Sequence, residues 1–181
     1  MKLDVKSIAA IGIGTALFFL LARFVSIPVF ANTTITFQYA LLAFFAVLFG
    51  PIVGAVIGIT GHLLSDMSWG WGVWWSWIVT SGVVGFGLGY VLKGVPIETG
   101  SFNKRAIVRF VIGSSLVNLV AWGGVAPILD ILIYAQAANF VFTQGLIAGV
   151  GNIIGTAVVG SLLLFAYSKT KAGEGSLVEE Q

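Results

Sequence analysis

The chain is a succession of long apolar segments separated by short polar ones. The first of these segments, residues 8–25, is close to the roughly 20 residues that an α-helix needs to cross a bilayer. Only 9% of the 181 residues are charged, whereas soluble domains have about 25%. Such a chain cannot cover itself with a solvated surface, so we expect an all-α integral membrane protein.

We expect six transmembrane helices in a membrane domain at residues 1–168, followed by a disordered cytoplasmic tail at residues 169–181. The second and third helices are short, about 20 Å each, and are expected to leave a depression at one membrane surface. Residues 26–36 are predicted to form a loop. Residues 123–139 contain glycine, proline and polar residues, which predicts a partly helical outer connection rather than a span. The predicted spans are residues 8–25, 37–49, 52–64, 74–92, 106–122 and 140–167.

The basic residues predict the orientation of these helices. Six spans place both termini on one side of the membrane, and eight of the nine basic residues fall on that side, with Arg23 alone opposite. The positive-inside rule makes this side cytoplasmic and predicts a multi-pass protein of the plasma membrane. The residues on the predicted cytoplasmic side are Lys2, Lys6, Lys93, Lys104, Arg105, Arg109, Lys169 and Lys171.

The predicted outer face receives residues 61–77, which hold five of the six tryptophans and the only histidine. Tryptophan gathers at membrane interfaces and also where a flat ligand needs a stacking surface. Five tryptophans within nine positions cannot all face lipid from one helix, so some are expected to face a ring-shaped ligand. The candidate binding residues on this side are Arg23, Gln38, Tyr39, His62, Asp66, Trp71, Trp74, Trp75, Asn118, Trp122 and Tyr134.

Each candidate also has a structural interpretation. Arg23 either grips a ligand or extends to the lipid headgroups. His62 and Asp66 are one helical turn apart, and His62 serves either a ligand or a structural hydrogen bond. The sequence has no further set of ligand residues in a matching pattern, so no metal site is predicted. It also has no nucleophile motif, so no catalytic residues are predicted. The chain also lacks a P-loop, so any ATP hydrolysis is expected in other proteins.

Several short motifs together resemble the substrate-binding S components of energy-coupling factor (ECF) vitamin transporters, in a branch often labelled riboflavin-like. They are Ile-Gly-Ile-Gly-Thr-Ala-Leu-Phe at 11–18, Arg-Phe-Val-Ser-Ile-Pro at 23–28, Leu-Phe-Gly-Pro at 48–51, Gly-His at 61–62 and Trp-Trp-Ser-Trp at 74–77. The resemblance implies an outward-facing vitamin pocket closed by the loops between helices 1 and 2, 3 and 4, and 5 and 6. It also implies a transmembrane coupling protein and two cytoplasmic ATPase subunits as partners, with no nucleic acid and no cofactor besides the vitamin substrate.

The first helix carries two pairs of small residues, Ala10 with Gly14 and Gly12 with Ala16. Such pairs let another helix approach closely. The resemblance implies that they dock on the coupling protein, while packing inside the chain is the alternative. If they dock, Gly14→Leu is expected to abolish transport and to spare ligand binding.

The substrate stays open at this stage. The tryptophans and amides of the outer face suit a large ring, so we favour cobalamin or a related corrinoid, with riboflavin and a thiamine-precursor pyrimidine as alternatives. A stand-alone secondary transporter and a small intramembrane enzyme are the rival classes of function. No internal repeat is evident, which weighs against an inverted-repeat transporter.

Overall fold

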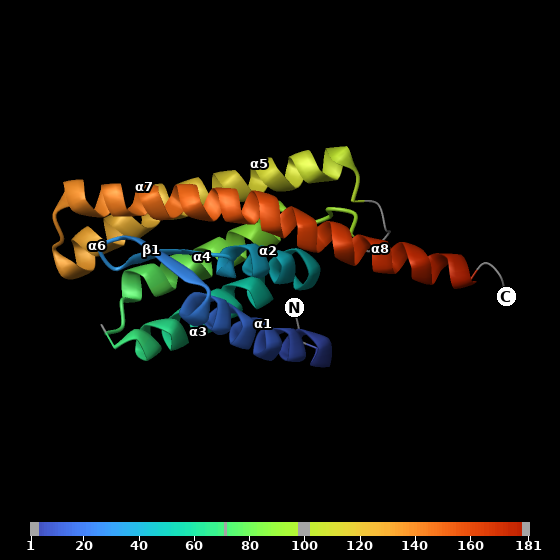
Figure 1. The fold of residues 1–181 in the computed structure, drawn as a ribbon, viewed down its shortest axis with the longest axis horizontal. Coiled ribbons are helices and arrows are strands. Elements are labelled where there is room, and N and C mark those ends of the chain that lie inside the picture. The colour runs from blue at the N-terminus through green and yellow to red at the C-terminus, as the bar shows by residue number, and fades with distance from the viewer. Residues whose placement is uncertain (1–3, 71, 98–101, 179–181) are drawn as a thin grey trace.

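The computed structural model describes residues 4–70, 72–97 and 102–178, with side chains as far as Lys171. It is a bundle of helices that carries a single β-hairpin at one end (Figure 1). Its elements are α1 (Val5–Phe24), β1 (Ser26–Phe30), β2 (Thr33–Thr36), α2 (Gln38–Phe49), α3 (Pro51–Trp69), α4 (Trp75–Val91), α5 (Lys104–Val120), η1 (Ala121–Val125), α6 (Ala126–Tyr134), α7 (Ala138–Gly155), η2 (Thr156–Gly160) and α8 (Ser161–Val178).

Four continuous helices in the described part of the chain are long and apolar enough to cross a membrane, and two shorter apolar helices accompany them. The long ones are Val5–Phe24, Pro51–Trp69, Lys104–Tyr134 and Ala138–Lys171, and the shorter ones are Gln38–Phe49 and Trp75–Val91. The fifth helix therefore extends beyond its predicted end at residue 122, because α5, η1 and α6 form one helix that ends at Tyr134. Likewise, α8 continues to Val178, beyond the predicted end of the last helix at residue 167.

The long fifth helix continues through Pro127, with a local distortion just before it. Proline cannot donate the backbone hydrogen bond to the residue four positions earlier, which is Gly123. The helix accommodates this loss by widening into the π-helical turn η1, Ala121–Val125. The widened turn keeps the helix continuous and places Trp122 in the protein interior, where it is 1% exposed.

The prediction that the second and third helices are both short is correct for the second and wrong for the third. Helix α2 has 12 residues, about 18 Å at 1.5 Å per residue, and is short as expected. Helix α3 has 19 residues and runs to Trp69, so the prediction that it ends at residue 64 was wrong. The start of α2 lines a cavity, through Gln38 and Tyr39. The hairpin β1–β2 lies next to this start, since β2 ends at Thr36 and α2 begins at Gln38.

Glycines set the close contact between α3 and α4. A Cβ atom at Gly85 would collide with the carbonyl of Gly54, and a Cβ at Gly58 would collide with the carbonyl of Ser81. The two backbones touch at these positions, which is the packing expected of helices joined by small residues in lipid. This contact fixes the α4 side chains relative to those of α3.

The two small-residue pairs of α1 lie on different faces. Ala10 and Gly14 are buried within the bundle, on one stripe with Phe18 and Ala22. A Cβ atom at Gly14 would lie 2.5 Å from Ile57 Cδ1, so the space beside Gly14 is already filled. At Gly12, by contrast, nothing lies within 4 Å of a Cβ, and Gly12 and Ala16 are both exposed.

The chain alternates between the two ends of the bundle. Figure 1 shows the start of α1, the end of α8 and the α4–α5 connection at one end, and the hairpin, the α3–α4 connection and the α6–α7 connection toward the other. The predicted cytoplasmic basic residues lie at or near the first end, except Lys2, which falls outside the described residues. The functional site lies toward the second end.

Candidate functional site

A cavity of about 300 Å³ opens near the hairpin end of the bundle. This volume lies at the lower limit of the range for small-molecule sites, about 300–1,000 Å³. Helices α1, α2, α3, α4, α6 and α7 contribute to its wall, together with the hairpin and η1. The lining residues are Ala22, Asn32, Thr34, Gln38, Tyr39, His62, Ser65, Asp66, Trp69, Trp74, Trp77, Trp122, Asp130, Gln136, Phe140, Val141, Gln144, Ala148 and Asn152.

Several of the predicted binding residues converge on this cavity, although the sequence separates them widely. Those that line it are Gln38, Tyr39, His62, Asp66, Trp74 and Trp122. The other predicted residues whose positions are known, Arg23, Trp75, Asn118 and Tyr134, surround the cavity without lining it. Trp71 lies outside the described residues.

The four predicted residues that do not line the cavity have identifiable contacts. The Arg23 guanidinium lies 4.4 Å from the ring centroid of Trp69, which is itself part of the lining. Trp75 is 51% exposed, and its backbone N–H donates to the Tyr134 hydroxyl at 2.9 Å. Asn118 is fully buried and donates to the Ser114 carbonyl at 2.9 Å. Arg23 and Tyr134 thus contact tryptophans of the site without lining the cavity themselves.

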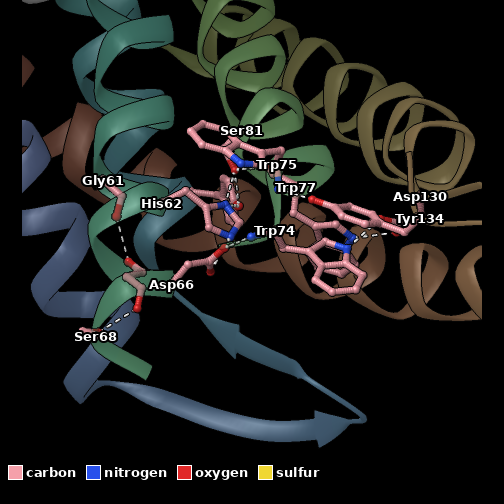
Figure 2. A network of polar contacts seen from close by, with 12 residues as sticks. Gly61, His62, Asp66, Ser68, Trp74, Trp75, Trp77, Ser81, Asp130 and Tyr134 are labelled. Atoms are coloured by element: carbon pink, nitrogen blue, oxygen red, sulfur yellow. Dashed lines mark hydrogen bonds and ion pairs between the residues drawn. The ribbon is translucent and has the colours of Figure 1, made fainter. Parts of the chain in front are cut away.

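The first polar cluster of the cavity is centred on His62. Its Nδ1 lies 2.6 Å from Ser81 Oγ, which is also 2.8 Å from the Tyr39 hydroxyl. On the other side of the ring, Nε2 lies 3.5 Å from Asp66 Oδ1. The second carboxylate oxygen of Asp66 accepts a hydrogen bond of 2.9 Å from the backbone N–H of Trp74. Figure 2 shows this chain of contacts between α3 and α4.

The second polar cluster is centred on Asp130 of α6, which is 2% exposed. Its Oδ1 accepts hydrogen bonds from Trp74 Nε1 at 2.7 Å and from the Ser76 hydroxyl, and its Oδ2 accepts one from Trp77 Nε1 at 2.8 Å (Figure 2). Tyr134, one turn further along α6, stacks on Trp74 with ring centroids 4.2 Å apart. Asp130 therefore holds two indole rings in fixed orientations at the cavity wall.

Gln144 fastens the hairpin over the cavity. Its side-chain amide donates to the Ala31 carbonyl and to Thr33 Oγ1, both at 3.0 Å. The register of the hairpin shifts between Pro28 and Phe30, which leaves one residue more on β1 and bends it. The cover is thus an ordered hairpin rather than the loop predicted from the sequence.

The sequence analysis left out of its list of binding residues some that the fold brings to the cavity. Asp130 carries a signal that was available, because it is an acid within an apolar helical segment. Gln144 and Asn152 are eight residues apart and share one face of α7 with Ala148, which also lines the cavity. Trp69 and Trp77 belong to the tryptophan-rich segment, but only the fold separates the tryptophans that face the cavity from Trp75, which does not.

Nowhere among the described residues does a group of three or more His, Cys, Asp or Glu side chains come close enough to hold a metal ion. The cavity instead combines flat aromatic walls with carboxylate, imidazole and amide groups. These groups suit a site that stacks a planar molecule and forms hydrogen bonds with its edges.

Comparison with known proteins agrees with this geometry. A family model described as the S component of the ECF-type riboflavin transporter matches residues 2–169. The chain belongs to the S-component family of ECF transporters. A UPF0397 protein of Enterococcus faecalis is 44% identical over 180 residues, covering 99% of this chain and 98% of that protein. Another from an Exiguobacterium species is 46% identical over 176 residues, covering 97% and 96% respectively.

The fold is also that of an S component. A solved structure described as the S component of a bacterial ECF transporter aligns with a TM-score of 0.52 and 17% sequence identity, over 96% of this chain and 97% of that one. Membership of the S-component family makes the protein a membrane protein and a substrate-binding subunit of a transporter rather than an enzyme. Its family implies partnership with an ECF transmembrane and ATPase module.

Proposed function

We propose that this protein captures a vitamin at the outer face of the plasma membrane and delivers it inward together with a transmembrane coupling protein and two ATPase subunits. The observation that carries the proposal is the position of the cavity, which lies toward the end of the bundle opposite the chain termini. The protein has a cavity that can hold a substrate. Its chain carries no P-loop with which to bind ATP and drive transport by itself.

The distribution of basic residues supports this orientation. Lys6, Lys93 and Lys104 lie at or beside helix ends that are remote from the cavity. By the positive-inside rule that end is cytoplasmic, which makes six membrane crossings with both termini inside and leaves the cavity open to the exterior. The short helices α2 and α4 then count as the two additional spans beside the four long ones.

The outward face of α1 is the best candidate for docking on the coupling protein. Gly12 and Ala16 are exposed and lie among exposed Ile13, Leu17 and Leu20. Small residues on an apolar face allow a partner helix to approach closely in lipid. Ala10 and Gly14 are occupied by packing inside the chain, so we assign docking to the Gly12 and Ala16 pair alone.

The size of the cavity bears on the choice of vitamin. Cobalamin is the ligand that we favoured from the sequence, but a corrinoid with its many side chains is far larger than a single heteroaromatic vitamin. A cavity of about 300 Å³ favours the two smaller alternatives, riboflavin and a thiamine-precursor pyrimidine, over an enclosed corrinoid. Tyr39, Trp77 and Trp122 form adjoining aromatic walls, with ring centroids 5.1–5.2 Å apart, of a size that suits such a ring.

Calorimetry with the purified full chain in detergent tests this function. We expect tight binding of one member of a panel of cobalamin, riboflavin, thiamine and its pyrimidine precursor, without ATP or any partner. Failure of every vitamin to bind would contradict the proposal. Uptake into liposomes that contain this chain alone, driven by an ion gradient, would instead establish the rival function of a secondary transporter.

A further inference from the structure

The electrostatic character of the cavity is acidic. Two carboxylates, Asp66 and Asp130, line it and are 6% and 2% exposed. Among the lining residues that the structure describes there is no lysine or arginine, and His62 is the one group that can carry a positive charge. Buried charges within a membrane protein are costly unless they are compensated. A ligand that brings a positive charge would supply the missing compensation.

The two carboxylates are not equally available to a ligand. Asp130 accepts three side-chain hydrogen bonds, which involve both of its oxygens. Asp66 uses only Oδ2, for the backbone N–H of Trp74, while Oδ1 faces His62 Nε2 at 3.5 Å, too far for a normal hydrogen bond. Within the described part of the chain, the contact of Asp66 Oδ1 is this long one with His62, so Oδ1 is the carboxylate oxygen with capacity left for a hydrogen bond to a ligand.

Two further groups in the lining lack hydrogen-bond partners. Gln38 Oε1, an acceptor, and Trp122 Nε1, a donor, are both buried and unpaired, in side chains that are 8% and 1% exposed. Buried polar atoms are nearly always paired in native proteins, so these two indicate a ligand edge that donates and accepts. The faces of Trp74, Trp77 and Trp122 also favour a cation, since aromatic rings attract positive charge.

We propose that the substrate is a planar nitrogen heterocycle that carries a positive charge, and that it binds with its charged edge at Asp66 and its ring against the tryptophans. This inference rests on the proposed function of vitamin capture and specifies the charge class of the vitamin. It excludes carboxylated and phosphorylated ligands, which would face two buried carboxylates.

The test is calorimetry with the full chain in detergent, using thiamine as a cation, riboflavin as a neutral ring and thiamine pyrophosphate as a phosphorylated analogue. Nicotinamide and 1-methylnicotinamide, which is methylated at the ring nitrogen, add a pair that differs by one methyl group and one charge. The variants are Asp66→Asn and, as a matched control, Asp4→Asn at the exposed start of α1. We expect the cations to bind most tightly, and Asp66→Asn to weaken them at least about thirtyfold, with Asp4→Asn unchanged.

The outcomes separate this inference from the proposed function. Tight binding of riboflavin or of the phosphorylated analogue, in preference to every cation, would overturn the charge assignment and leave vitamin capture intact. Equal affinity of Asp66→Asn and the unmodified chain for a bound cation would also overturn it. If no vitamin binds at all, the proposed function fails and the charge assignment fails with it. Circular dichroism and a thermal melt of Asp66→Asn confirm that the variant is folded.

Discussion

Two glycines on α1, only two residues apart, should respond in opposite ways to the same substitution. Gly14 faces the interior, where a Cβ atom would lie 2.5 Å from Ile57 Cδ1 and 3.3 Å from Phe45 Cγ. Carbon atoms prefer separations of about 3.5–4.0 Å, so even alanine requires Ile57 to move. The further atoms of leucine need a displacement of helix α1 itself. At Gly12 no atom lies within 4 Å of the added Cβ.

The magnitudes follow from this difference in space. Overpacking of an interior costs about 1–3 kcal/mol, and Gly14→Leu belongs at the upper end because leucine adds four carbon atoms. A loss of about 3 kcal/mol lowers the melting temperature of a chain of this size by about 6–12 °C. Gly12→Leu should leave the melting temperature unchanged or slightly higher, since leucine favours a helix over glycine by up to about 1 kcal/mol.

Thermal unfolding in detergent, followed by tryptophan fluorescence, measures the first effect. Vitamin uptake in cells or liposomes that also contain the coupling protein and the ATPases measures the second. Gly12→Leu should lose uptake and keep its ligand affinity, because it blocks the docking face alone. A wild-type melting temperature for Gly14→Leu would refute the packing argument, and normal uptake by Gly12→Leu would refute the docking assignment. The earlier expectation that Gly14→Leu spares ligand binding is replaced by this pair.

Three further outcomes are expected. Asp130→Asn should destabilise the protein by about 2–3 kcal/mol, because the amide nitrogen cannot accept from an indole N–H; a melt with an unchanged midpoint would contradict the assigned network. Gly85→Ala should lower the melting temperature more than Gly124→Ala, since a Cβ at Gly85 collides with the Gly54 carbonyl and one at Gly124 meets nothing within 4 Å. In this cysteine-free chain, a membrane-impermeant thiol reagent applied outside cells should label Asn32→Cys and leave Lys104→Cys unlabelled; the reverse pattern would invert the topology.

The residues of the site divide by the kind of signal that identifies them. His62, Asp66 and the neighbouring tryptophans could be found from the sequence because a polar, aromatic cluster within lipid-like sequence is costly without a function. Asp130 also carried such a signal. Its role could not be predicted, because its partners Trp74 and Trp77 lie more than 50 positions away along the chain. The π-helical turn at Ala121–Val125, which precedes Asp130 in the same long helix, is another feature that periodicity does not reveal.

The sequence by itself determined the environment of the protein and the end of the bundle at which its polar and aromatic groups gather. Composition, segment length and basic residues act residue by residue through transfer from water to lipid, so they can be read without knowing any contact. Only the tertiary structure determined which faces of each helix pack against the rest of the protein. Ala10 and Gly14 turned inward while Gly12 and Ala16 stayed outward, and Trp77 met the cavity while Trp75 did not. Side chains on one helix are nearly equivalent until a neighbouring backbone occupies the space beside some of them.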